Sequence, residues 1–436
     1  MIRYLFLALA GAAVLAPRAQ AQDMDHSHHK LPISSQDDRN VCVANQAIQR
    51  WSNGSGSSRL PGNESTMGSG CTDAASSHTP GGLHTMSGEW MLMAHGFVSA
   101  QYTDHSGPRG DDKLYATSMA MLTGARKTSW GRIQLKSMLS LEPAMDAAGY
   151  PNLFASGETA NGDALVDRQH PHDLFMELAV RLDFNIGEGT TAFLYGGPVA
   201  EPALGPSAFM HRNSADVNPE PPITHHWFDS THITYGVVTA GISAPRWQIE
   251  TSAFRGAEPD EERWGIESPK LDSWSVRGTY NPAPRWLLQA SYGDIKEPEA
   301  LHPGEGEKRF TASVHYSTPG LSAMLAFSAK NRVPGPTLTA WLAEANWNID
   351  QHNTLFSRIE NVRNDEFFPD HDDPLHDESF RMTKFQAGYA RRIRLDPFSL
   401  ALGGSLSTYA KPNALDAAYG GRPWGYTVFT KLSLGH

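Results

Sequence analysis

Segments of about ten residues with alternating polar and apolar side chains recur from about residue 89 to residue 436. In the clearest of them, the apolar residues Leu174, Met176, Leu178, Val180, Leu182 and Phe184 share one face, and the charged residues Glu177, Arg181 and Asp183 share the other. A period of two is typical of a β-strand that has one face in an apolar environment. Because a soluble sandwich alternates as well, this pattern leaves two all-β architectures open.

The lengths of the connections favour one of these architectures. Short turns at 127–131, 185–189, 244–246, 281–285, 317–320, 350–353 and 395–397 alternate with longer polar segments near 104–112, 143–171, 197–229, 256–271, 293–307, 331–336, 363–377 and 411–422. Short turns at one end and long loops at the other are typical of barrels of the outer membrane. Aromatic residues beside the short turns predict a girdle at one lipid interface, formed by Trp130, Trp247, Trp286, Trp347 and Phe398. We predict an antiparallel transmembrane β-barrel of about 16 strands over residues 89–436.

The first 88 residues have a different character. Arg3, the apolar run 4–15 and the small residues of Ala19-Gln20-Ala21 predict a secretory signal peptide over residues 1–21. Residues 22–88 are rich in Gly, Ser, Asn and Asp, which predicts a mostly irregular segment, and Cys42 and Cys71 would pair as a disulfide in an oxidising compartment. We therefore expect the outer membrane of a Gram-negative bacterium, with residues 22–88 in the periplasm or in the lumen.

Composition limits the partners. The 47 acidic residues outnumber the 36 Lys and Arg residues and give a net charge of −11, which argues against nucleic acid as a partner. No run beyond the signal peptide is long and apolar enough for a membrane helix. The expected partners are outer-membrane lipid and small solutes or metal ions, and a homo-oligomer is one assembly that the barrel would allow.

Charged residues on the polar faces of the predicted strands would line the lumen. They carry both signs: Arg132, Lys136, Glu177, Arg181, Asp183, Glu250, Arg277 and Arg309. Such a mixture indicates either a weakly selective aqueous path or an interior cross-linked by salt bridges. The first functional hypothesis is therefore a porin-like channel for small solutes or ions, which requires no cofactor.

Histidines concentrate in two of the long loops. Six of the 19 histidines lie between residues 170 and 232, together with acidic residues, and His170, His172, His225, His226 and His232 are the candidates for a common site. Imidazole with carboxylate suits zinc or copper, so a metal-handling protein is the second hypothesis. A hydrogen-bonded network of histidines and carboxylates that braces the loops over the barrel mouth is the alternative.

Two further segments carry soft-metal ligands. After the signal peptide, a short tract with Met24 places His26, His28 and His29 close together, and imidazole with thioether favours copper. Met91, Met93 and His95 share one face of the first predicted strand. If that face points to the lumen, a thioether and imidazole path begins there; if it points to lipid, the methionines are ordinary packing.

These features resemble those of known families. Residues 89–436 resemble bacterial outer-membrane porin-like proteins in architecture, and the runs 167–178 and 205–241 look like those of an outer-membrane family without assigned activity. The Met/His tract before the barrel is similar to the leader of the outer-membrane copper-resistance B proteins, although it is a single short tract here. The resemblance implies copper as a candidate ion.

An interfacial outer-membrane hydrolase is a further alternative. His232 with Ser230 or Ser207 would supply a nucleophile and base, and Asp173, Asp229 and His225 would suit an aspartate/histidine protease. No Gly-x-Ser-x-Gly motif accompanies them. We therefore predict no catalytic residues.

Overall fold

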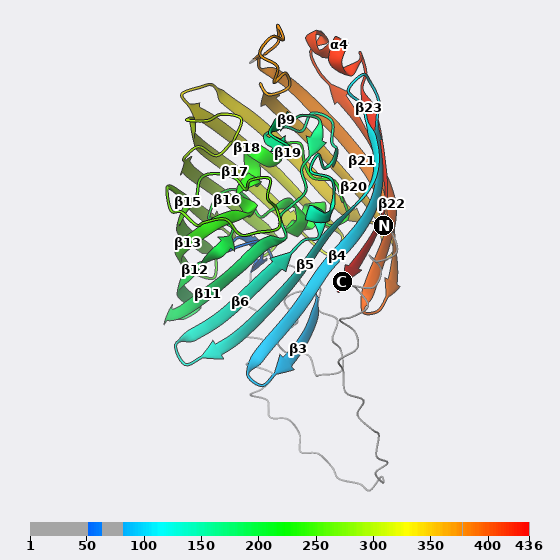
Figure 1. Cartoon of the computed structure of the whole chain (residues 1–436). Coiled ribbons are helices and arrows are strands. Elements are labelled where there is room, and N and C mark those ends of the chain that lie inside the picture. Colours follow the sequence, from blue (N-terminus) through cyan, green and yellow to red (C-terminus); the bar gives the residue numbers. More distant parts are fainter. Residues whose placement is uncertain (1–50, 63–81, 377, 436) are drawn as a thin grey trace. The chain divides into compact units, whose positions relative to one another are not determined.

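The computed structural model describes residues 51–62, 82–376 and 378–435. The signal peptide, the leader histidines and both cysteines fall outside these residues. The described chain forms a closed barrel with an antiparallel wall (Figure 1). Among the described residues, no helix has the length and hydropathy needed to cross a bilayer.

Sixteen long strands make up the wall, as the sequence predicts. They are β4 (Trp90–His105), β5 (Asp112–Thr128), β6 (Gly131–Leu139), β11 (Phe175–Gly187), β12 (Thr190–Ala200), β13 (Thr234–Ser243), β14 (Trp247–Phe254), β15 (Ser273–Tyr280), β16 (Trp286–Ile295), β17 (Gly306–Ser317), β18 (Leu321–Val333), β19 (Thr337–Asn348), β20 (Asn353–Asn364), β21 (Phe380–Leu395), β22 (Phe398–Ala410) and β23 (Trp424–Leu434).

The barrel closes where β23 pairs with β4, from Gly425 opposite His105 to Leu434 opposite Gly96. Below that point β3 (Leu83–Ser87) takes the same place beside β4, with Leu83 opposite Ala94. Residues 83–87, which the composition places in the irregular segment, therefore complete the seam. β4 therefore has a partner on this side along Trp90–Ala94 and along Gly96–His105, as a barrel in lipid requires.

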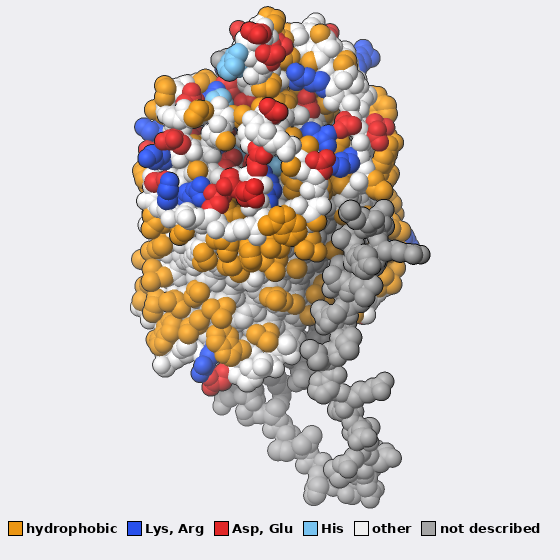
Figure 2. Space-filling model, in the orientation of Figure 1, with side chains coloured by type: hydrophobic (Ala, Val, Ile, Leu, Met, Phe, Trp, Pro, Cys, Tyr) orange, Lys and Arg blue, Asp and Glu red, His pale blue; other side chains and the backbone are white. Residues whose placement is uncertain are grey.

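The outer face of the wall is apolar. Alternate residues of β18 show the pattern, since Leu321 and Leu325 are exposed and Ser322 and Met324 between them are buried. Figure 2 shows a band of apolar side chains around the visible face, with charged side chains gathered above it. The aromatic residues beside the short turns, Trp130, Trp247, Trp286, Trp347 and Phe398, are all exposed on this outer face. A transmembrane barrel presents such a band and girdle to lipid.

The interior is filled. The connection 140–174 carries four short strands, β7 (Tyr150–Pro151), β8 (Glu158–Ala160), β9 (Asp163–Leu165) and β10 (Arg168–Gln169). The connection 201–233 carries α3 (His225–Phe228) and three 3₁₀ turns, η3 (Phe209–His211), η4 (Asn213–Ala215) and η5 (Ser230–His232). Most side chains of both connections are buried, and Phe154, Trp227 and Phe228 pack in one apolar cluster with wall residues. Both connections therefore fold inward, and Figure 1 shows their ribbons inside the wall.

Residues 51–62 also lie inside the barrel. They form a small hairpin of β1 (Trp51–Asn53) and β2 (Arg59–Pro61). The Ser57 hydroxyl donates to Glu250 Oε2 at 2.5 Å, and an Arg59 Nη2 donates to the Ala244 carbonyl at 2.8 Å. We call this hairpin, residues 51–62, the plug. Its hydrogen bonds hold it against β14 and the β13–β14 turn.

Three further short elements lie in the connections between wall strands. They are η2 (Glu142–Ala144), η6 (Asn413–Leu415) and α4 (Asp416–Tyr419). Two details differ from the predicted pattern. A register shift between Phe175 and Glu177 turns Met176 inward, where it is 1% exposed, although alternation places it with the lipid-facing residues. The β18–β19 connection, at 334–336, is also as short as the turns at the other end.

Candidate functional site

The charged residues predicted for the lumen lie on the inner faces of the strands and are buried. Lys136, Glu177, Arg181, Asp183, Glu250, Arg277 and Arg309 are each at most 7% exposed, and only Arg132 has a side chain that is one-third exposed. They pair with one another and with the inserted segments, for example Arg277 with Glu250 at 2.9 Å and Lys136 with Glu177 at 3.0 Å. Of the two readings of the mixed charges, the salt-bridged interior is the arrangement found.

The first inserted connection positions His170 and His172. Asp167, at φ +61°, accepts a hydrogen bond from the Phe154 amide at 2.7 Å, which folds residues 152–167 into a compact turn. Pairing of β10 with β7 then leads the chain into His170-Pro171-His172. Glu142 fixes the position of His172, because its Oε2 accepts from both the amide and the Nδ1 of His172, at 3.0 and 2.8 Å.

The second inserted connection positions the other three histidines. The Thr224 amide and hydroxyl both donate to Glu360 Oε2 on β20, at 2.9 and 2.8 Å, at the start of α3. The Trp227 carbonyl accepts from Ser328 on β18 at 2.8 Å. The short helix is therefore tied to two wall strands, and it carries His225 and His226. The following 3₁₀ turn carries His232.

These two connections bring all five candidate histidines together. Ring centroids lie 5.1 Å apart for His225 and His232, 5.2 Å for His172 and His232, and 5.4 Å for His225 and His226. His170 lies 6.0 to 6.4 Å from His172, His225 and His226. All five side chains are at most 7% exposed. We call them the five-histidine cluster.

Donor atoms in the cluster are oriented but largely unpaired. The Nδ1 atoms of His170, His172 and His232 lie 2.7 to 3.0 Å from the Pro171 carbonyl, Glu142 and the Asp229 carbonyl respectively. If Nδ1 carries the proton in each, Nε2 holds a lone pair. The Nε2 atoms of all three are buried and have no hydrogen-bond partner in the described chain. An outer group on Nδ1 with a free Nε2 is the usual arrangement of a metal-ligating histidine.

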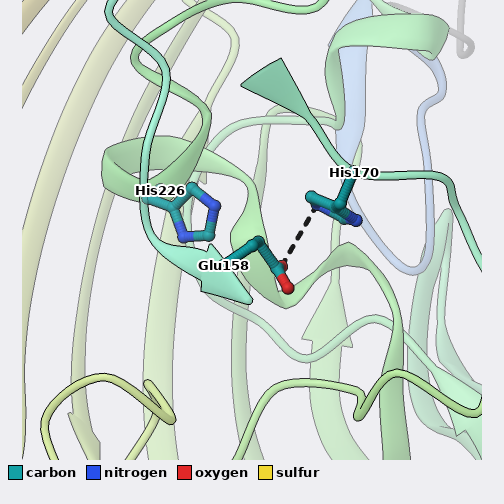
Figure 3. Close-up of side chains that lie close together, drawn as sticks. All are labelled: Glu158, His170 and His226. Atoms are coloured by element: carbon teal, nitrogen blue, oxygen red, sulfur yellow. Dashed lines mark ion pairs between the residues drawn. The ribbon is translucent and has the colours of Figure 1, made fainter. Parts of the chain in front are cut away.

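Carboxylates complete one part of the cluster. Glu158, His170 and His226 offer ligand atoms within 4.8 Å of one another, and Figure 3 shows the three side chains converging. The Nε2 of His170 lies 3.1 Å from Glu158 Oε1, and the Nδ1 of His226 lies 3.4 Å from Glu258 Oε1. At these distances both contacts are ion pairs when the imidazole is protonated.

Electrostatics divide the cluster. Burial lowers the pKa of His170 and of His232 well below the ordinary value, so both rings are neutral at pH 7, which is the form that binds metal. Burial opposes protonation of His226 as well, but Glu258 and then Glu158 raise its pKa to about 9. Burial raises the pKa of Glu158. His226 is therefore protonated at pH 7, and its charge is balanced by these two carboxylates.

A glycine makes room for the cluster. Gly157 has φ +111°, and a Cβ there would lie 2.7 Å from the Nδ1 of His226. Both the backbone conformation and the close approach of the imidazole ring therefore favour glycine at this position.

The groups nominated for a hydrolase have other partners. The Ser230 hydroxyl accepts from Arg309 Nη1 at 2.9 Å, and the Ser207 hydroxyl contacts the Ser55 amide and hydroxyl at 2.9 and 3.1 Å. Asp173 lies 3.3 Å from Arg263, and Asp229 lies 3.1 Å from Arg212. The hydroxyls are therefore bound to the plug and the wall in this structure.

Several functional carboxylates have no sequence signal. Glu142 and Glu158 come from the connection 140–174, and Glu258 comes from the connection between β14 and β15. Two further groups of ligand atoms link His226, Glu258 and Glu299, and then Glu299, His302 and Glu366. Only the folding of the connections into the lumen brings them to the histidines. The leader histidines His26, His28 and His29 and the cysteines Cys42 and Cys71 lie outside the described residues.

Comparison with known proteins identifies the fold. No protein-family model and no curated protein matches the chain. The solved structure of OmpF from Salmonella typhi in complex with daunomycin matches with a TM-score of 0.52 and 9% identity, over 81% of this chain and all of the other. DcaP, an outer-membrane channel of Acinetobacter baumannii, gives 0.48 and 11%, over 81% and 99%. An anion-selective porin of Comamonas acidovorans gives 0.47 and 13%, over 79% and 100%. In fold the chain is thus similar to the OmpF porin, and these comparisons show no similarity to copper-resistance proteins.

Proposed function

We propose that this protein is an outer-membrane barrel that binds a transition-metal ion, zinc or copper, in its filled interior. One observation carries the proposal: the five-histidine cluster is buried and three of its rings are oriented through Nδ1. The Nε2 atoms of His172 and His232 have no hydrogen-bond partner in the described chain, and the Nε2 of His170 faces Glu158 Oε1 at 3.1 Å. Buried polar atoms in a stable protein are otherwise almost always paired. Neutral imidazole suits zinc and copper.

A hydrogen-bonded network that only braces the loops does not account for the unpaired imidazole nitrogens. Histidines that only brace loops would share protons with carboxylates or carbonyls on both ring nitrogens. Here the wall contacts are made by other groups, such as Thr224 with Glu360 and Trp227 with Ser328, and these already fix the connections. Within the described chain, the Nε2 atoms of His172 and His232 are therefore available to a ligand. Glu158, His170 and His226 are the residues best placed to bind the ion directly. Glu142 and the Asp229 carbonyl would orient the rings of His172 and His232.

Metal binding to the full-length protein in detergent micelles tests the proposal. Titration calorimetry with Zn²⁺ and Cu²⁺ is compared for the wild type and a His170→Gln/His226→Gln variant. Loss of ligands from the cluster is expected to weaken binding by roughly 100-fold or more, because even outer partners contribute about 10–100-fold. His315→Gln is the matched control, since His315 is a buried wall histidine bonded to Ser313 at 3.0 Å. Equal affinities of all three proteins would reject the site.

The tract with His26, His28 and His29 could also bind copper in this titration. A His26→Gln/His28→Gln/His29→Gln variant separates the two sources of heat. If that variant loses all binding and the cluster variant loses none, the leader is the metal site. Reduction and thiol labelling of the intact chain tests the proposed Cys42–Cys71 disulfide in the same preparation.

Passage of small solutes or ions is a second candidate. A barrel of 16 strands has room for an aqueous channel, and here the space is taken by the plug and the two connections. In the described chain the short strands of these segments form sheets separate from the barrel, and side-chain contacts such as Ser57 with Glu250 hold the segments to the wall. We expect low single-channel conductance for the whole protein and higher conductance after deletion of residues 51–62. A closed channel in both forms would count against this candidate, and cross-linking in the same micelles would report a homo-oligomer.

A further inference from the structure

Methionines and two histidines that do not belong to the five-histidine cluster gather on the inner face of β4, β5 and β6. His95 lies opposite Met121, and Met121 lies opposite Met138, so the three residues are direct neighbours on adjacent strands. Side chains opposite one another on one face of a sheet have Cβ atoms about 4.5–5.5 Å apart. Met121 and Met138 are 6% and 4% exposed.

The second inserted connection adds another imidazole to this row. The His211 Nε2 lies 3.4 Å from Met138 Sδ, and the ring centroids of His211 and His95 are 6.1 Å apart. Met119 and Met176 belong to the same buried cluster, and Met210 packs against it. Two imidazoles and at least two thioethers from four separate segments of the chain therefore converge.

Ordinary core packing does not account for the histidines. The Nδ1 of His95 is buried and has no hydrogen-bond partner in the described chain. The contact recorded for His211 is with a thioether, which is a weak acceptor. A leucine or phenylalanine would fill the same space without burying an imidazole that lacks a strong partner.

We propose that His95, Met121, Met138 and His211 form a second metal site, which takes a soft monovalent cation such as Cu⁺. Thioether and neutral imidazole carry no charge and are soft or borderline donors, so they select Cu⁺ over Zn²⁺ or Mg²⁺. The site rests on observations independent of the five-histidine cluster. The pairing of His95 with the buried Met121 also places the row Met91, Met93 and His95 on the inner face of β4.

The exposed methionines of that row provide a route for the cation to the buried site. Met91, on the same inner face as His95, is 43% exposed, Met93 and His95 are partly buried, and Met121 is 6% exposed. Met86 of β3 lies opposite Met91 and is 65% exposed. Thioethers thus continue from the end of the barrel near the short turns to the buried site.

The test uses Ag⁺ as a redox-inert probe and Cu⁺ in competition with a chromogenic chelator. The full chain carries His26→Gln/His28→Gln/His29→Gln throughout, so that the leader does not contribute. Met121→Leu/Met138→Leu keeps volume and apolar character while removing both sulfurs. Met324→Leu/Met382→Leu is the matched control, because Met324 and Met382 are equally buried wall methionines in another cluster.

We expect the Met121/Met138 variant to bind Ag⁺ and Cu⁺ at least 100-fold more weakly, while the control binds as the parent does. Parent-like affinity of the Met121/Met138 variant, or an equal loss in the control, would overturn the proposal. A measurement on the parent protein guards against misfolding of the variant. Bound Ag⁺ should protect Met121 and Met138, but not Met324, from oxidation by peroxide, and mass spectrometry measures the oxidation of each methionine. Equal oxidation of all three with and without Ag⁺ would also overturn the proposal.

Discussion

Arg212 connects the second inserted connection to the wall, and its removal should release that connection. The guanidinium is fully buried and donates to Glu344 Oε1 at 2.6 Å, to Asp229 Oδ2 at 3.1 Å and to the Ser207 carbonyl at 3.2 Å. Arg212→Leu leaves both carboxylates in place without this partner. Breaking a buried ion pair by removing one side costs about 3–5 kcal/mol.

The contacts that Glu344 and Asp229 keep in Arg212→Leu determine which carboxylate contributes most of this loss of stability. Glu344 keeps Arg358 at 3.2 Å and Ser214 at 2.8 Å, whereas Asp229 keeps the Phe209 amide at 2.9 Å. Asp229 is therefore the less compensated group. We expect Arg212→Leu/Asp229→Asn to recover part of the loss, about 1–2 kcal/mol, because the second change removes an unpaired buried charge.

Hydrogen exchange followed by mass spectrometry measures this locally. If the substitution lowers the free energy of local opening of this connection by about 3–5 kcal/mol, its amides lose roughly 100- to 5,000-fold of their protection, at about 1.4 kcal/mol per factor of ten. The loss should be confined to peptides from 201–233 and should spare the strands. Arg422→Leu is the control, because Arg422 is exposed. Less than about a threefold change in 201–233 would refute the view that this guanidinium holds the connection.

Three further predictions concern the cluster and the inserted segments. Gly157→Ala should lower zinc affinity about tenfold by displacing the His226 ring, with strand content unchanged by circular dichroism; unchanged affinity would contradict the placement of His226. Glu142→Leu should lower zinc affinity by about 10–100-fold, because His172 loses the group that orients it, whereas Glu188→Leu on an exposed turn should not. Burial raises the pKa of Glu201, beside the plug, to about 7. The folded state therefore holds this proton more tightly, so its contribution to stability is full below the ordinary pKa of 4.5 and declines by up to about 3 kcal/mol as the pH rises through 7. Denaturation of Glu201→Gln in guanidinium should show a flatter pH profile, and identical profiles would contradict the assignment.

The wall was predictable because its signals are local. A residue's face follows from its position in the strand, and the turns at one end are short enough to be recognised from Pro, Gly and Asn. Met176 was misassigned because a register shift beside it is set by its partner strand β6, at residues distant in sequence. One bulge reverses one side chain, and alternation carries no sign of it.

The candidate site was only half predictable. His170, His172, His225, His226 and His232 stand out through their density in two connections. Their meeting depends on both connections folding into the lumen, and composition does not distinguish a polar loop that turns inward from one that extends into solvent. Glu142, Glu158 and Glu258 are single acidic residues among many, so only the fold selects them.

The plug precedes the first long strand, yet its partners lie far along the chain. Ser55 bonds to Ser207, 152 residues later, and Ser57 contacts Glu250 and Arg277, 193 and 220 residues later. Such non-local contacts form only after the intervening chain has been ordered. The plug therefore docks after β14 and β15 are in place, so the order of assembly runs against the order of synthesis. A segment that precedes every wall strand in the chain is thus among the last to find its native contacts, and until then its place inside the barrel is open to water.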